Sequence, residues 1–169
     1  ALVVCDEPVS ALDVSIRAQT MNLLADLRDS LDVAFLFIAH DLAVVRHLSD
    51  RVAVMYLGRI VEEGPSEQLF SDPRHPYTQG LVAAILRADP KARSRLDAVE
   101  RLAAGELPSP LDPPPGCSYS TRCPYALDDP CRGEAPQLQL IGANGDEPHR
   151  ASCHRIAEIP LVDPTVRAR

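Results

Sequence analysis

Two acidic side chains and one histidine follow apolar runs of the chain. Asp6 and Glu7 come directly after the apolar run 1–5, and His40 follows the apolar run 33–38. In a parallel sheet, ligands bind beyond the carboxyl ends of the strands, so the three side chains are expected to meet there. Adjacent carboxylates suit phosphate chemistry, because one can hold Mg²⁺ through water while the other orients or deprotonates an attacking water. The alternative is structural: Asp-Glu-Pro ends a strand and His40 caps a helix.

A second group of reactive side chains lies near the end of the chain. Four of the five cysteines follow the pattern Cys-x5-Cys-x7-Cys-x21-Cys: Cys117, Cys123, Cys131 and Cys153. Four thiolates bind either tetrahedral Zn²⁺ or an iron–sulfur cluster. Structural zinc usually uses Cys-x2-Cys arms, which this spacing lacks, so the wider loops favour a bulkier cluster. His149 and His154 are possible substitute ligands, and unrelated surface and core thiols are the alternative.

The composition suits a soluble domain with an appendage. Of 169 residues, 46% are hydrophobic, and the net charge of −7 argues against nucleic-acid binding. The longest apolar run, 33–39, is far shorter than the roughly 20 residues of a membrane-spanning helix. No export signal is visible, so the cytosol is the expected compartment, where cysteines stay reduced. The chain begins at Ala1 inside an apolar strand, which predicts a fragment of a longer protein.

The apolar segments predict an α/β fold in which a parallel sheet packs against helices. Strands at 1–5 and 33–38 flank a helix that Ser10 and Asp13 are expected to cap, which makes a parallel crossover unit. The expected apolar stripe of this helix is Ile16, Leu23, Leu24, Leu27 and Leu31. The later expected elements are a helix to about residue 48, a hairpin of 51–56 with 59–63, and helices at 65–70 and 76–86.

Prolines separate the cysteines from the rest of the chain. Five of them fall between Pro108 and Pro115, which predicts a stiff extended linker ending at Gly116. The expected organisation is an α/β part at 1–64, a helical connector at 65–107, a proline linker with a small, irregular, metal-stapled extension at 108–156, and a tail at 157–169.

Three motifs in the first part of the chain resemble those of ABC-transporter ATPases. They are Leu-Val-Val-Cys-Asp-Glu-Pro at 2–8, Ser-Ala-Leu-Asp at 10–13, and an apolar strand ending in Ile-Ala-His-Asp at 38–41. Their order and spacing resemble the Walker B strand, the D-loop and the H-loop of that family. The resemblance implies a P-loop ABC ATPase core, of which this chain carries the C-terminal part.

The same resemblance implies a role for each residue. Asp6 becomes the aspartate that binds Mg²⁺, and Glu7 becomes the catalytic base. Asp13 becomes the D-loop residue that faces the partner subunit, and His40 the switch histidine on the γ-phosphate of ATP. The phosphate-binding Gly-x-x-x-x-Gly-Lys loop, the glutamine loop and the Leu-Ser-Gly-Gly-Gln signature do not occur in these residues, whose only lysine is Lys91. This chain alone is therefore not expected to hydrolyse ATP.

The second half resembles the C-terminal extension of oligopeptide/dipeptide-type ABC importer ATPases. The resemblance rests on Asp-Pro-Arg-His-Pro-Tyr-Thr at 72–78, the proline linker, and Cys-x5-Cys-Pro-x-Ala-x4-Cys before a final Cys-His. Some members of that group carry a 4Fe-4S cluster on four such cysteines, which implies the same here, with Zn²⁺ as the alternative. His75 is interpreted as structural, and Cys5 as a small buried residue.

This resemblance implies an ATP-hydrolysing subunit of an importer for peptides or nickel. The implied partners are two membrane-spanning permease subunits, a second ATPase subunit and an extracytoplasmic binding protein, with no nucleic acid. The subunit would lie at the cytoplasmic face of the membrane as a peripheral protein. Two alternatives remain: a non-transporter ABC ATPase, and a stand-alone iron–sulfur or zinc module with a relic ATPase half.

Overall fold

The computed structural model describes residues 1–85, 108–144 and 147–160. These residues form two compact units, Ala1–Asp50 and Arg51–Arg169, which divide inside the segment expected at 1–64. Each unit is described by itself. The described part of the chain contains no helix that is long and apolar enough to span a bilayer.

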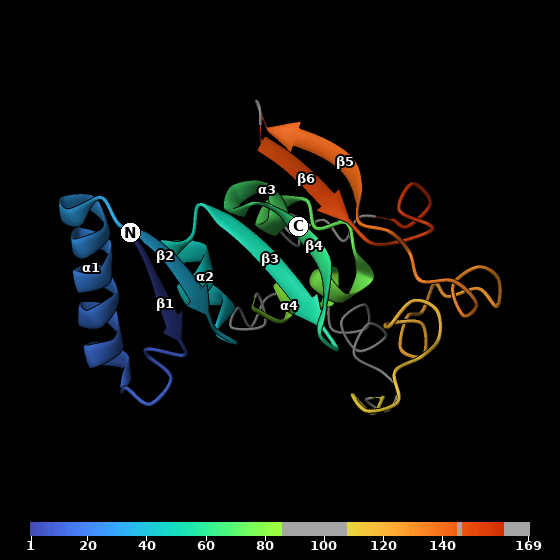
Figure 1. Cartoon of the computed structure of the whole chain (residues 1–169), viewed down its shortest axis with the longest axis horizontal. Helices are drawn as coiled ribbons and strands as arrows, with labels where there is room; N and C mark the ends of the chain where they lie inside the picture. The colour runs from blue at the N-terminus through green and yellow to red at the C-terminus, as the bar shows by residue number, and fades with distance from the viewer. Residues whose placement is uncertain (86–107, 145–146, 161–169) are drawn as a thin grey trace, which may run out of the picture. The chain divides into compact units, whose positions relative to one another are not determined.

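The first unit is built on a pair of parallel strands (Figure 1). Its elements are β1 (Leu2–Asp6), α1 (Val14–Leu31), β2 (Ala34–Ile38) and α2 (Leu42–Leu48). The register of β1 against β2 runs from Leu2↔Ala34 to Asp6↔Ile38. The strand–helix–strand order with parallel pairing, and with it the α/β class, is confirmed.

The cap of α1 differs in part from the expectation. The Asp13 side chain accepts a hydrogen bond from the backbone N–H of Ile16 and is the N-cap. Ser10 does not cap the helix, because its hydroxyl donates to the carbonyl of Glu7 at 3.0 Å and closes the turn after β1. The helix ends at Asp32, whose φ of 48° lies in the left-handed region that aspartate tolerates.

The expected apolar stripe of α1 is only partly turned inward. Ile16, Leu23 and Leu31 are 44%, 56% and 63% exposed in this unit. The buried core consists of Val9, Val44 and Leu48, with Leu12, Met21, Ala25 and Phe37 packed against it. Leu24 and Leu27 of the expected stripe are half-buried, and Met21 and Ala25, about one helical turn apart, also pack against this core.

The second unit contains a four-stranded antiparallel sheet with the order β3-β4-β6-β5 (Figure 1). Its strands are β3 (Arg51–Tyr56), β4 (Arg59–Pro65), β5 (Gln139–Asn144) and β6 (Glu147–Ala151). The expected β3–β4 hairpin is present, and Leu57 and Gly58 form its turn with positive φ values of 46° and 74°.

The segment after the cysteine-containing loop (residues 117–131) is more regular than expected. The sequence predicted an irregular segment, but β5 and β6 form a hairpin that pairs with β4 through Glu62↔Ala151 and Glu63↔Arg150. The missed signal is the Gly-Asp pair at 145–146, because this dipeptide between two apolar runs is typical of two-residue hairpin loops.

The proline-rich stretch also departs from the extended linker that was expected. A turn forms at 109–112, where the backbone N–H of Asp112 donates to the carbonyl of Ser109. The Ser109 hydroxyl accepts from the N–H of Leu111 and stabilises the turn. At the end of this stretch, residue 116 must be glycine, because a Cβ there would clash with the carbonyl oxygen of Cys131.

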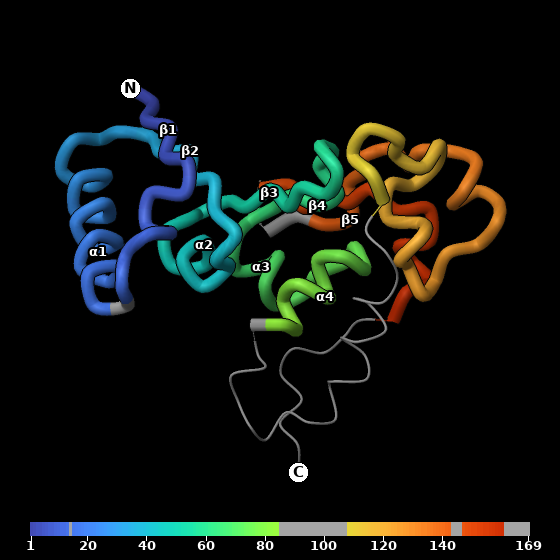
Figure 2. The backbone as a smooth tube through the Cα atoms, turned by 90° about the horizontal axis from the view of Figure 1, so that it is seen from below, coloured from blue at the N-terminus to red at the C-terminus, as the bar shows by residue number. Residues whose placement is uncertain are grey.

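Helices α3 (Ser66–Ser71) and α4 (Pro76–Ile85) lie on one side of this sheet (Figure 2). Both helices were expected at nearly these positions, although Leu86, the predicted last residue of the second one, lies outside the described residues. Val82 of α4 is buried, and so are Leu69 and Phe70 of α3. The two helices thus contribute apolar side chains to the core of this unit.

A fully buried carboxylate connects three segments of this unit. Glu62 of β4 accepts hydrogen bonds from the backbone N–H groups of Arg74 and His75, each at 2.8 Å. His149 of β6 places Nε2 2.7 Å from the same carboxylate, and both side chains are at most 1% exposed. Because a buried carboxylate is costly unless its oxygens are satisfied, these three bonds fix the β6 strand and the start of α4 relative to β4.

Aromatic side chains attach the cysteine-containing loop to the β3–β4 turn, and this loop lies beside that turn in both overall views (Figures 1 and 2). The ring of Tyr119 lies 5.3 Å from that of Tyr56 and 5.5 Å from that of Tyr77, measured between centroids. It also lies 5.8 Å from the His75 ring. Tyr119 is 1% exposed, so the loop is anchored by a side chain in the core.

The buried carboxylate predicts a strong effect of one substitution. Glu62→Gln puts an amide donor against backbone N–H donors, and we expect the free energy of unfolding to fall by about 3 kcal/mol or more. Glu63→Gln is the matched control, since Glu63 pairs with Arg150 near the surface, and the expected loss is below about 1 kcal/mol. Denaturant unfolding followed by circular dichroism measures both, and equal losses would contradict the role of Glu62.

Candidate functional site

Glu7 and His40 meet at the carboxyl ends of the paired strands of the first unit. The Nδ1 atom of His40 lies 2.9 Å from Oε1 of Glu7. The backbone of Glu7 has a φ of 47°, and its N–H donates to the carbonyl of Ile38 at 2.8 Å. This left-handed turn sets Glu7 beside the end of β2, so the structure brings together two of the four residues predicted in this site.

The other two predicted residues lie nearby in the chain but not in the same cavity. Asp6 is the last residue of β1 and pairs with Ile38. Asp13 is the α1 cap, and the Ile16 N–H that it accepts lowers its pKa, with the Ser15 hydroxyl adding to the effect. The cavity itself is lined by Glu7, Val9, Ser10, Arg17, Ala39, His40 and Asp41.

An ion pair in this cavity was missed by sequence reasoning. Arg17 of α1 places Nη1 2.9 Å from Oδ2 of Asp41, and its Nη2 donates to the carbonyl of Leu12. Asp41 is also the N-cap of α2, since its side chain accepts from the N–H of Ala43. The pair joins residues 24 positions apart, so no local spacing pattern indicates it. It fixes the segment that carries His40 against the start of α1.

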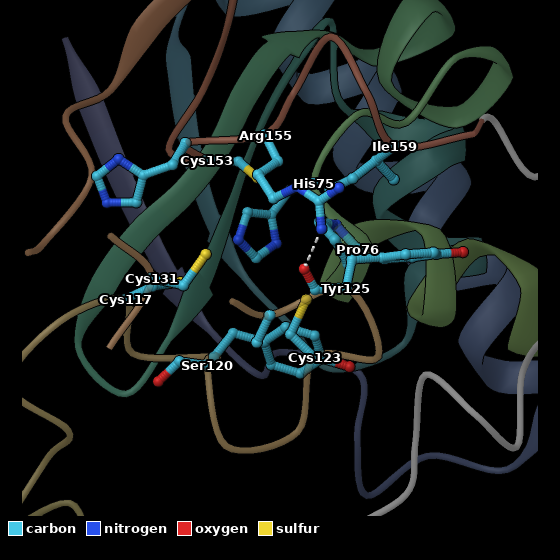
Figure 3. Close-up of a pocket in the computed structure, with 13 residues that line it drawn as sticks. His75, Pro76, Cys117, Ser120, Cys123, Tyr125, Cys131, Cys153, Arg155 and Ile159 are labelled. Atoms are coloured by element: carbon cyan, nitrogen blue, oxygen red, sulfur yellow. Dashed lines mark hydrogen bonds between the residues drawn. The ribbon is translucent and has the colours of Figure 1, made fainter. Parts of the chain in front are cut away.

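The four predicted cysteines line a single cavity in the second unit (Figure 3). Three come from the loop after the proline-rich stretch and Cys153 from the segment after β6. The backbone N–H of Cys117 donates to the carbonyl of Cys131 at 2.8 Å, which holds the two ends of the loop together. Cys5 lies on β1 in the other unit. Residues up to 36 positions apart thus share one site, as the sequence predicted.

Burial raises the pKa of three of these thiols. It raises the pKa of Cys123 and of Cys153 to about 11, and it also raises the pKa of Cys117. Without a bound metal the side chains are therefore neutral thiols at pH 7. A metal that binds here must displace their protons, as thiolate coordination generally requires.

Zinc ions and iron–sulfur clusters differ in how closely they bring the sulfurs of their thiolate ligands together. Within residues 1–85, 108–144 and 147–160, no three His, Cys, Asp or Glu side chains converge closely enough to hold one metal ion. Around tetrahedral zinc, Zn–S bonds of about 2.3 Å bring the sulfurs to about 3.8 Å from one another. A cubane cluster binds each thiolate to a separate iron, so its sulfurs lie farther apart.

Of the three histidines near the cysteines in the sequence or structure, two line this cavity. His149, a candidate ligand, is instead bonded to Glu62 in the core. His154, the other candidate, lines the cavity, but its Nε2 donates to the carbonyl of Glu134 at 2.9 Å. His75 directly precedes α4, and its Nδ1 accepts a hydrogen bond from the backbone N–H of Tyr77. Its ring also lines the cavity.

Arg155 links two of the cysteine-bearing segments. Its Nη1 donates to the carbonyl of Tyr125 at 2.7 Å, and its Nε donates to Glu158 at 2.9 Å. Tyr125 follows Cys123 by two residues, and Arg155 follows Cys153 by two, so the guanidinium holds both cysteine segments at the cavity wall (Figure 3). This clamp involves one charged group and a backbone carbonyl, a pairing that spacing patterns do not reveal.

Comparison with known proteins finds a family match within the second unit. Residues 61–131 match the family described as the oligopeptide/dipeptide transporter, C-terminal region. This segment runs from β4 through the His-Pro-Tyr sequence to Cys131. The chain corresponds in sequence to the C-terminal part of an oligopeptide/dipeptide-type ABC ATPase, which confirms the resemblance inferred from the motifs.

Individual relatives support the same assignment. The dipeptide transport ATP-binding protein DppF of Escherichia coli is 52% identical over 142 residues, which cover 83% of this chain and 41% of that protein. DppF of Haemophilus influenzae is 51% identical over 139 residues, with 82% and 41% coverage. A probable peptide ABC transporter ATP-binding protein of Sinorhizobium fredii is 54% identical over 138 residues, with 82% and 38% coverage. The chain thus spans about two fifths of these curated relatives.

The buried His75 predicts a specific pH dependence of stability. Burial lowers its pKa to about 3, while in the unfolded chain the pKa returns to about 6.5. The unfolded state therefore binds a proton first, so stability is complete above pH 6.5 and is lost as the pH falls towards 3. At about 1.4 kcal/mol per pH unit, the loss between pH 6.5 and pH 4 is on the order of 3 kcal/mol. Denaturant unfolding of the parent and of His75→Asn measures it, and identical pH slopes would contradict the assignment.

Proposed function

We propose that the full-length protein is the ATP-hydrolysing subunit of an ABC importer that takes up oligopeptides, dipeptides or nickel. The observation that carries this proposal is the 2.9 Å contact between Glu7 and His40 at the carboxyl ends of adjacent parallel strands. It agrees with the names of the relatives, which are dipeptide and peptide transport proteins. Two permease subunits, a second ATPase subunit and an extracytoplasmic binding protein would be its partners, at the cytoplasmic face of the membrane.

Each residue of the first site has a defined role in this proposal. Glu7 is the base that takes a proton from the attacking water, and His40 holds Glu7 and the terminal phosphate in line. Asp6 binds Mg²⁺ through water, and Asp13 faces the partner ATPase subunit. The Arg17–Asp41 ion pair is a positioning element, because it fixes the segment that bears His40. ATP and Mg²⁺ are the implied cofactors, and the phosphate-binding loop must come from residues outside this chain.

We propose further that Cys117, Cys123, Cys131 and Cys153 hold a 4Fe-4S cluster. Support comes from the cavity that the four side chains share. When bound, the cluster supplies four iron–thiolate bonds that cross-link the loop to the segment after β6. Its site lies among structural contacts of the second unit, which favours a structural or regulatory role over direct chemistry on ATP.

The role of Glu7 is tested in the full-length protein by Glu7→Gln. Gln keeps the size of the side chain and an acceptor for His40, so ATP and Mg²⁺ binding should persist. Loss of the base should slow hydrolysis by about 10² or more. Glu67→Gln, at an exposed position in the first turn of α3, is the control and should hydrolyse ATP at the parent rate. Steady-state phosphate release measures both, and parent-like turnover by Glu7→Gln would refute the assignment.

The cluster is tested by the colour and metal content of protein purified without oxygen. The full-length protein should be brown, with about four irons and four sulfides per chain. Changing any one of the four cysteines to Ser should bleach it, because the loss of one thiolate exposes an iron. Cys5→Ser is the matched control and should stay brown. A colourless protein with one tightly held zinc would overturn the cluster, and unchanged metal in all four variants would overturn the ligand set.

A further inference from the structure

One guanidinium group contacts the segments that carry both Glu7 and His40. Arg17 of α1 places Nη1 2.9 Å from Oδ2 of Asp41, the residue that directly follows His40. Its Nη2 donates to the carbonyl of Leu12 at 3.3 Å. Arg17 also lines the cavity that Glu7 and His40 share. The two arms of one side chain thus reach two segments that meet in this cavity.

The first arm binds the turn that follows Glu7. The backbone N–H and the hydroxyl of Ser10 donate to the carbonyl of Glu7 at 3.2 Å and 3.0 Å. The N–H of Leu12 donates to the carbonyl of Val9 at 3.3 Å, and Val9 is buried in the core of this unit. The Leu12 carbonyl that Arg17 binds therefore belongs to a hydrogen-bonded turn that begins at Glu7.

The second arm binds the start of α2. The Oδ1 atom of Asp41 accepts from the N–H of Ala43 at 3.0 Å, while its Oδ2 faces Arg17. One carboxylate therefore caps the helix and holds the guanidinium. Since His40 immediately precedes this cap, the contact limits where its ring can lie, and that ring places Nδ1 2.9 Å from Oε1 of Glu7.

Stability alone does not account for Arg17. Its side chain and that of Asp41 are 30% and 35% exposed, and ion pairs that solvent reaches contribute little to stability. The Nε atom of Arg17 is buried and makes no hydrogen bond within the part of the chain that the structure describes, which costs free energy. The planar guanidinium nevertheless holds two acceptors at defined positions, which is the property that a positioning residue needs.

We propose that Arg17 is a positioning residue that aligns Glu7 with His40 for the hydrolysis of ATP. This inference rests on the proposed function and deepens it, because it names the residue that sets the geometry of the base and the histidine. Arg17 acts through the turn after Glu7 and through Asp41, and it takes no part in proton transfer itself. A displacement of reacting groups by about 1 Å can slow a reaction by about 10²-fold, so this alignment affects the rate strongly.

Two variants of the full-length protein test the contact from its two ends. Arg17→Lys keeps the positive charge but offers one nitrogen in place of the planar fork. Asp41→Asn keeps the Oδ1 acceptor that caps α2 and removes the charge that faces Arg17. Each should lower kcat for ATP hydrolysis by about 10-fold or more and change KM for ATP by less than about 3-fold. The double variant should lose no more than the slower single variant, since both changes remove one contact.

Arg28→Lys is the matched control. Arg28 also joins α1 to the segment of α2, but away from the site: its Nη1 donates to the carbonyl of Leu48 at 3.2 Å and lies 3.9 Å from Asp50. This variant should hydrolyse ATP at the parent rate. Equal slowing of Arg17→Lys and Arg28→Lys would mean that the contact matters only for packing between the helices, and it would overturn the proposal.

The parent protein separates failure of this inference from failure of the proposed function. A full-length parent that does not hydrolyse ATP overturns both. A parent that hydrolyses ATP, with unchanged kcat in Arg17→Lys and Asp41→Asn, overturns the role of Arg17 alone. Thermal unfolding and ADP binding show whether each variant is folded, and loss of folding in both would make the pair a structural element and would also overturn the positioning role.

Discussion

The buried carboxylate of Glu62 is the interaction on which the second unit depends. It satisfies the backbone N–H groups of Arg74 and His75 and the side chain of His149, and so ties β4, the start of α4 and β6 to one point. Glu62 and His149 are 87 positions apart in the sequence. Removing one partner would leave buried charge or buried donors without compensation, which costs more than the pair contributes when intact.

Contacts around this carboxylate also hold the cysteine-containing loop to the rest of the second unit. The cysteine-containing loop contributes Tyr119, whose ring packs on Tyr56 and Tyr77. His75 then connects the two systems, since its backbone is bonded to Glu62 and its ring lines the cysteine cavity. Because His75 lines the cavity and directly precedes α4, a structural change in the cavity would alter the start of this helix. These contacts give a physical basis for a structural or regulatory role of a cluster.

Sequence patterns predicted what depends on local order and spacing. The parallel strands, the β3–β4 hairpin, the Glu7–His40 contact and the common cysteine cavity all follow from periodicity, turn residues and motif order. They missed what depends on pairing between distant residues: the Arg17–Asp41 ion pair, the Glu62–His149 pair and the Arg155 clamp. The inward face of α1 was predicted only in part, because Met21 and Ala25, which the predicted stripe did not include, pack against the core of the first unit.

The central claim is that the four cysteines and their buried surroundings form a cubane iron–sulfur site. Mössbauer spectroscopy of the full-length protein, produced with ⁵⁷Fe and purified without oxygen, tests this claim most directly. The account predicts paired iron sites of mixed valence with tetrahedral sulfur coordination and no net magnetism in the oxidised state. A spectrum of isolated high-spin iron, or no protein-bound iron at all, would contradict it.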